Sequence, residues 1–136
     1  MLRAAIVEDS HPVRVVWRDL LLQIGGIEIS GEYIRASTAI DGIRANPPDI
    51  VLLDIQLENS TGFEVLKMVS AEYPRTRVIV ITNYIDDVYR QKYMAAGAYA
   101  FCDKNRELRR FRKLLEDLAG SASTATDPPP QGPKSP

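Results

Sequence analysis

Five polar side chains in this sequence end, or closely follow, short apolar runs. They are Glu8, Asp9, Asp54, Thr82 and Lys104. If these runs are parallel strands of one open sheet, their carboxyl ends lie along one edge, which is where such sheets bind ligands. The sequence therefore predicts that three carboxylates, one hydroxyl group and one ammonium group converge on a single edge of a sheet.

These groups suit phosphoryl chemistry with a hard metal ion. Two unit charges about 4 Å apart repel by about 4 kcal/mol at an effective dielectric of 20, so gathered carboxylates favour a cation. A small set of oxygen ligands suits Mg²⁺, which keeps several waters and takes one or two carboxylates plus phosphate oxygens. Lys104 can neutralise a transferred phosphoryl group, and Thr82 can hydrogen-bond it. A zinc or iron site is not indicated, because His11 is the only histidine and Cys102 the only cysteine.

Short apolar runs supply the strands that would position these groups. The runs 4–7, 50–53 and 78–81 are continuously apolar, which is typical of strands covered on both faces. Residues 27–33 alternate between apolar and polar types and suit an edge strand, and 99–102 is a fifth, short candidate.

Longer segments with helical spacing of apolar residues separate these strands. They cover residues 13–24, 37–45, 63–69, 85–96 and 108–118. This alternation of five strands and five helices predicts a right-handed parallel sheet with helices on both faces.

Composition indicates one domain, expected over residues 1–119. The 136 residues, 45% of them apolar, are enough for one core, and the net charge of −1 gives no global preference for nucleic acid. A single cysteine suits a reducing cytosol, and no apolar run reaches the roughly 18 residues of a membrane span, so we expect a cytoplasmic protein without membrane contact. Ser, Thr, Ala and Pro dominate residues 120–136, for which we predict a flexible tail.

Several short motifs together resemble the receiver domain of response regulators, the phosphorylated proteins of two-component signal transduction. The motifs are Ile6-Val7-Glu8-Asp9-Ser10, then Asp54-Ile55-Gln56-Leu57 with Gly62, then Ile81-Thr82, and finally Gly97-Ala98 before Phe101 and Lys104. The resemblance covers about residues 2–119. It implies a flavodoxin-like, doubly wound α/β fold with five parallel strands in the order 2-1-3-4-5 and five helices. With no output domain in this chain, it is similar to the stand-alone receivers of chemotaxis.

This resemblance also implies roles for the acidic residues. Asp54 would accept a phosphoryl group from a phosphohistidine on a sensor histidine kinase or a histidine phosphotransfer protein. Mg²⁺ would be held by Glu8, Asp9 and Asp54 together with the backbone carbonyl of Gln56. The protein would promote only its own phosphorylation and dephosphorylation, and would otherwise not be an enzyme.

A switch is implied as well. Lys104 would bind the phosphoryl group, and Thr82 would move toward it, after which Phe101 would turn inward. This would change the surface formed by helix 85–96, strand 99–102 and the last helix, and a downstream protein or a second copy of the chain would bind there. Phe101 can equally be ordinary core packing.

Departures from the family pattern lie close to the predicted acceptor. Asn83 stands where Ala or Ser is usual, and Gln56 and Tyr84 occupy positions that tune access of water to Asp54. We therefore expect slow loss of the phosphoryl group. Asp103 stands before the lysine where an apolar or small residue is common.

Three alternatives compete with a phosphorylated switch. A pseudo-receiver would act by protein binding without phosphorylation. A hydrolase of the haloacid dehalogenase type needs a second Asp two positions after its nucleophile, where this chain has Gln56. A flavin-binding protein needs a Ser-, Thr- or Gly-rich phosphate loop after the first strand, and Glu8-Asp9-Ser10-His11 repels phosphate unless a metal is bound.

Nucleic-acid binding is not expected, although the last predicted helix is basic. The basic residues in this helix and just before it are Arg106, Arg109, Arg110, Arg112 and Lys113. No recognition helix or reader motif accompanies them, so they are interpreted as a solvated face.

Overall fold

The computed structural model describes residues 1–126 and contains seven strands and five helices in that range. In chain order they are β1 (Leu2–Val7), α1 (His11–Ile24), β2 (Ile27–Tyr33), α2 (Ala36–Ala45), β3 (Ile50–Leu53), β4 (Gln56–Leu57), β5 (Ser60–Thr61), α3 (Phe63–Glu72), β6 (Arg77–Thr82), α4 (Asp87–Ala95), β7 (Ala100–Asp103) and α5 (Leu108–Thr126).

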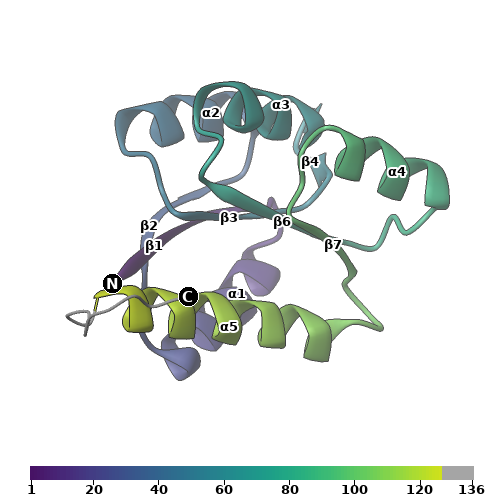
Figure 1. Cartoon of the computed structure of the whole chain (residues 1–136). Helices are drawn as coiled ribbons and strands as arrows, with labels where there is room; N and C mark the ends of the chain where they lie inside the picture. The colour runs from purple at the N-terminus through teal and green to yellow at the C-terminus, as the bar shows by residue number, and fades with distance from the viewer. Residues whose placement is uncertain (127–136) are drawn as a thin grey trace.

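Five of the strands form one parallel sheet in the order β2-β1-β3-β6-β7. Counted along this sheet, the order is 2-1-3-4-5, so the predicted flavodoxin-like fold is confirmed. Helices α1 and α5 cover one face, while α2, α3 and α4 cover the other (Figure 1). The carboxyl ends of β1, β3, β6 and β7 consequently lie along one edge, which we call the rim.

Burial on both faces explains why the central strands are continuously apolar. On the side of α1 and α5, Ile6 and Leu52 pack with Trp17 and Phe111. On the opposite side, Val51 belongs to a second cluster with side chains from α2, α3 and α4. Because each central strand contacts both clusters, neither face tolerates polar residues until the strand reaches the rim.

A small hairpin and the start of α4 differ from the sequence-based expectation. Strands β4 and β5 pair antiparallel directly after β3, and Asn59 at their turn has a φ of 53°, in the left-handed region that Asn tolerates better than most residues. Helix α4 begins two residues later than the predicted 85. Asp86 precedes it, and its carboxylate accepts a 2.6 Å hydrogen bond from the Val88 amide, which fixes that start.

Helix α5 extends past the predicted domain boundary at residue 119, to Thr126. Residues 120–126, expected to be flexible, are therefore helical. A helix that has started adds residues without a new nucleation step, and this stretch contains no proline to stop it. The rest of the predicted tail, 127–136, lies outside the described residues.

Candidate functional site

Predicted site residues gather at the rim because each continues a strand of the sheet. The Asp54 amide donates to the Val7 carbonyl at 3.0 Å, and the Lys104 amide donates to the Thr82 carbonyl at 2.8 Å. These bonds extend the strand pairing one residue past the strand ends. They bring residues from β1, β3, β6 and β7 into one place, as the sequence predicted.

A lysine joins two buried carboxylates at the centre of this site. Lys104 Nζ donates to Glu8 Oε1 at 2.9 Å and to Asp54 Oδ2 at 2.8 Å. Glu8 is 1% exposed and Asp54 is 6% exposed. One ammonium group therefore neutralises two acids that are nearly removed from water, the situation in which losing a partner costs most.

Burial also alters the proton affinities of these groups. Burial, reinforced by the negative charge of Asp54, raises the pKa of Glu8 to about 7. For Lys104, burial acts to lower the pKa, but the hydrogen bonds and charges of Asp54 and Glu8 outweigh it, so the pKa is raised overall. Lys104 therefore stays charged, and Glu8 is a carboxyl group that changes its protonation near neutral pH.

The loop that carries Glu8 is held by the start of α1. Ser10 Oγ accepts from the Val13 amide, and the Ser10 amide donates to Glu8 Oε2 at 3.0 Å. Arg14 donates to the Glu8 backbone carbonyl at 2.9 Å and forms an ion pair with Glu32 on β2. The sequence alone does not point to Arg14, because its spacing on α1 indicates only a partly exposed helix position.

Gly62 explains part of the motif that follows Asp54. A Cβ atom at residue 62 would collide with the Asp54 backbone carbonyl and the Leu53 side chain. The Gly62 amide donates to the Ile55 carbonyl at 2.9 Å, and the Gln56 amide donates to Asp54 Oδ1 at 3.3 Å. The requirement for glycine is thus the close return of the hairpin to the backbone beside Asp54.

A pocket of about 350 Å³ opens onto Asp54 at the rim. Its walls include most of the predicted site residues, namely Glu8, Asp9, Asp54, Gln56, Asn83, Tyr84 and Lys104. Asp9, Gln56, Asn83 and Tyr84 are exposed on these walls. Thr82 is fully buried, and its hydroxyl oxygen accepts a 3.1 Å hydrogen bond from the Tyr84 amide.

The donor atoms of this pocket suit Mg²⁺, although they do not form a ready metal site. Within residues 1–126, no three His, Cys, Asp or Glu side chains lie close enough together to hold a metal ion. Glu8 and Asp54 are instead held by Lys104, and Asp9 is exposed on the wall. The donors are all hard oxygens, so the chemistry fits Mg²⁺, but the ion has to compete with the ammonium group.

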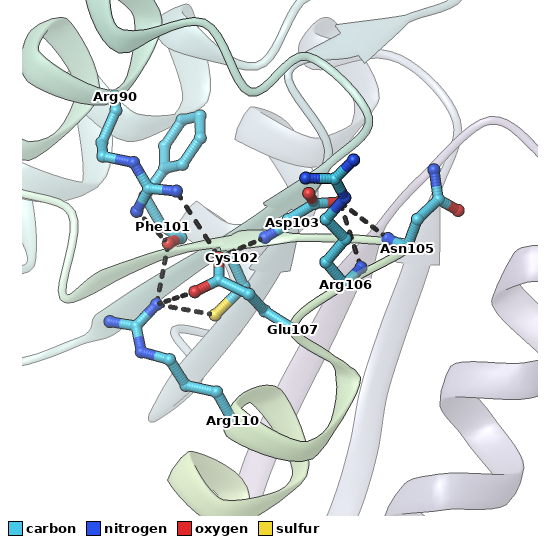
Figure 2. A network of polar contacts seen from close by, with 8 residues as sticks. All are labelled: Arg90, Phe101, Cys102, Asp103, Asn105, Arg106, Glu107 and Arg110. Atoms are coloured by element: carbon cyan, nitrogen blue, oxygen red, sulfur yellow. Dashed lines mark hydrogen bonds and ion pairs between the residues drawn. The ribbon is translucent and has the colours of Figure 1, made fainter.

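Phe101 does not have the position expected for a switch at rest. Its side chain is 1% exposed and packs edge-on against Tyr93, with ring centroids 6.1 Å apart. The Arg90 guanidinium lies 5.0 Å from the centre of the Phe101 ring, and Figure 2 shows Arg90 beside that ring. Because the ring is already buried, the inward turn predicted to follow phosphorylation has no outward starting position here.

Asp103, which departs from the family pattern, has a structural role. Its carboxylate accepts from the amides of Asn105 and Arg106, at 2.8 and 3.3 Å, and so fixes the turn that follows Lys104. Its own amide donates to Glu107 Oε1 at 2.8 Å (Figure 2). Asp followed two residues later by a turn amide is a recognisable local signal, because Asp side chains bond their own backbone at that spacing.

A comparison with protein families identifies the chain. The model of the response regulator receiver domain matches residues 4–116. The chain belongs to this family. Its receiver domain is 34% identical over 119 residues to a response regulatory protein of Yersinia pestis, with 88% of this chain and 49% of that protein covered. It is 31% identical over 106 residues to the Fimbriae Z protein of Salmonella typhimurium, covering 77% of this chain and 50% of that protein.

Solved structures agree with the receiver fold. A LuxR-family two-component response regulator from Aurantimonas sp. superposes with a TM-score of 0.80 at 23% identity, covering 89% of this chain and 86% of the other. The response regulator domain of Thermotoga maritima CheB gives 0.77 at 23% identity, with 94% and 99% covered. The chain spans about half the length of the curated relatives it matches. No helix among residues 1–126 is long and apolar enough to cross a membrane.

Proposed function

We propose that this receiver domain is a signalling switch that takes a phosphoryl group on Asp54. The observation that carries the proposal is the bridge from Lys104 Nζ to Asp54 Oδ2 and Glu8 Oε1 inside an open, polar pocket. A structural ion pair needs no opening to solvent, whereas a phosphoacceptor does. The lysine is also placed to meet the charge of an arriving phosphoryl group.

The transfer itself needs one new bond and one broken bond. A carboxylate oxygen of Asp54 attacks the phosphorus atom of a phosphohistidine, and the bond from phosphorus to the imidazole nitrogen breaks. The imidazole leaves with its electron pair and takes a proton from the surroundings. Lys104 stabilises the phosphoryl oxygens, and Glu8 and Asp9 would hold a metal ion beside them. Mg²⁺, when bound, shields the phosphoryl oxygens from the carboxylates.

Its partners are those that membership of the receiver family implies. The donor is a sensor histidine kinase or a histidine phosphotransfer protein. The output surface is formed by α4, β7 and α5, and it binds a downstream protein or a second copy of the chain. Thr82 provides a link to the α4 side, because its hydroxyl bonds the Tyr84 amide in the loop that leads to α4.

Phosphorylation with a small-molecule donor tests the proposal. Wild type should incorporate one label per chain from radiolabelled acetyl phosphate in the presence of Mg²⁺, and hydroxylamine should release it. Asp54→Asn keeps the shape but removes the nucleophile, so it should incorporate none. Asp19→Asn, an exposed position on α1, is the matched control and should behave as wild type. Equal labelling of Asp54→Asn and wild type would refute the assignment.

One observation favours a second candidate, a pseudo-receiver that acts by protein binding alone. Lys104 already satisfies Glu8 and Asp54, and the third acid, Asp9, is exposed on the pocket wall and is not part of this bridge. A pseudo-receiver would show no label with any donor, and Mg²⁺ with beryllofluoride would leave its NMR spectrum unchanged. The switch predicts label and shifts around Asp54.

A further inference from the structure

Two arginines from different helices meet at the free edge of the sheet. Arg90 on α4 and Arg110 on α5 each donate from NH1 to the carbonyl oxygen of Phe101, both at 2.9 Å. Strand β7 is the last strand of the sheet, so this carbonyl has no neighbouring strand on that side. Figure 2 shows the two guanidinium groups approaching the oxygen from opposite sides.

The acceptors around this arginine pair are weak for two charged groups. A backbone carbonyl is neutral, and the Cys102 sulfur, 3.4 Å from Arg110 NH1, is a poor acceptor. Among the described residues, Glu107 is the carboxylate that pairs with both arginines, and its oxygens lie 3.5 Å from Arg90 and 3.7 Å from Arg110. All three side chains are 31–46% exposed. A second carboxylate would therefore bind here more strongly than the groups now present.

We propose that Arg90 and Arg110 form a carboxylate-binding site for an acidic segment of a partner protein, and that Glu107 is an internal competitor for it. This inference rests on the proposed function and assigns a partner chemistry to its output surface. A peptide carboxylate fits better than nucleic acid, because the site is one pair of guanidinium groups at a single carbonyl, whereas a phosphate backbone needs basic contacts repeated along its length.

A chain of contacts joins Glu107 to the phosphoacceptor. Glu107 Oε1 accepts from the Asp103 amide at 2.8 Å, and the next residue, Lys104, binds Asp54. When Lys104 follows the new phosphoryl group, the Asp103 amide moves with it and shifts the carboxylate that occupies the arginines. Phosphorylation thereby changes the affinity of the site for the acidic segment, without any rotation of Phe101.

An acidic peptide of defined sequence serves as the probe. Binding of a terminally blocked, fluorescein-labelled decaglutamate is measured by anisotropy on the full chain. Arg90→Gln and Arg110→Gln should each weaken binding about tenfold, and Arg109→Gln, which removes the same charge from the adjacent position on α5, should weaken it less than about threefold. Glu107→Gln should strengthen binding about fivefold, since it removes the competitor. That gain is one that a misfolded variant would not show.

Different results would overturn the inference. An equal loss in all three arginine variants means that the basic surface attracts the peptide without a specific site. No gain in Glu107→Gln means that Glu107 does not compete, and tighter binding of a decathymidylate oligonucleotide means that the site prefers nucleic acid. The assays on the Arg90, Arg110 and Glu107 variants use unphosphorylated protein, so their outcome does not depend on whether Asp54 is the acceptor, and failure of the proposed function is seen separately. Labelled wild type with unchanged peptide affinity would refute the coupling to phosphorylation.

Discussion

Two sets of ion pairs in this receiver domain have similar lengths and opposite surroundings. At the rim, Lys104 binds Glu8 and Asp54 at 2.9 and 2.8 Å, with 15% of the lysine side chain and 1% of the glutamate side chain exposed. Between α2 and α3, Arg44 binds Glu72 at 2.6 Å, with 50% and 42% exposed. Distance alone would rank the second pair as the stronger.

Burial reverses that ranking. A charge at the surface that loses its partner is solvated by water, so the exposed pair contributes little. A buried charge that loses its partner has no such replacement. At the rim, water cannot compensate a change of charge such as phosphorylation. The surrounding side chains therefore have to rearrange there.

The largest effect on stability is expected from Lys104→Met. This variant keeps the length of the side chain but leaves Glu8 and Asp54 without a cation, which should cost about 4 kcal/mol at pH 8. At pH 5 the loss should be smaller, because Glu8 is protonated there and only one carboxylate is left uncompensated. Urea denaturation at the two pH values measures this, and an equal loss at both would show that the two acids are not coupled through the lysine.

A somewhat smaller change in stability is expected when Glu8 ionises. The pKa of Glu8 is raised from 4.5 to about 7, so its contribution is fully present below pH 4.5 and is lost as pH rises through 7. In a metal-free buffer with a chelator, the free energy of unfolding should therefore fall by about 3 kcal/mol as the pH rises through this window.

Glu8→Gln isolates that slope. The variant cannot ionise, so its free energy of unfolding should vary much less than that of wild type between pH 4.5 and 7. Glu72→Gln, which removes the acid of the exposed pair, is the control and should keep the wild-type slope. If wild type becomes more stable as pH rises through this window, the sign assigned to Glu8 is wrong.

A smaller effect is expected on the lifetime of the phosphoryl group when Tyr84 is replaced. Tyr84 is 43% exposed on the wall of the rim pocket, and its ring packs edge-on against Tyr89. Tyr84→Ala should admit water and shorten the lifetime about fivefold, a change of about 1 kcal/mol in the barrier. Tyr99→Ala, equally exposed but outside the pocket wall, should leave it unchanged. A longer lifetime in Tyr84→Ala than in wild type would contradict this.

The smallest effect is expected from the exposed pair. Arg44→Ala should leave the urea midpoint of wild type unchanged within error, despite the loss of two hydrogen bonds to Glu72. The same experiment on Lys104→Met provides the contrast. A loss in Arg44→Ala that approaches the loss in Lys104→Met would mean that burial does not separate the two sets.

Much of the rim could be predicted, because it depends on short-range pattern and on a general rule. Continuous apolar runs mark strands covered on both faces, and residues that follow them in a parallel sheet must meet at one edge. This places Glu8, Asp54, Thr82 and Lys104 together without any knowledge of tertiary contacts. The order of the strands came from the family motifs, since periodicity alone does not determine it.

Other features depend on contacts between distant segments. The buried rotamer of Phe101 is set by Tyr93 and Arg90 on α4, which no local pattern connects to β7. The arginine pair, Arg90 and Arg110, is similar: neither residue stands out in the sequence of its own helix, and only the fold brings both to one carbonyl. The bridge from Lys104 to both acids also needed the structure, because a lysine can point into solvent as readily as inward.

Chemical trapping of the phosphorylated residue tests the proposed switch most directly. Wild type is incubated with phosphoramidate and Mg²⁺ and then reduced with borohydride, which converts an aspartyl phosphate to homoserine. Peptide mass spectrometry should find homoserine at residue 54 and at no other aspartate. Homoserine at Asp9 or at another carboxylate, or none at all under conditions that label a known receiver, would contradict the assignment of Asp54 as the acceptor.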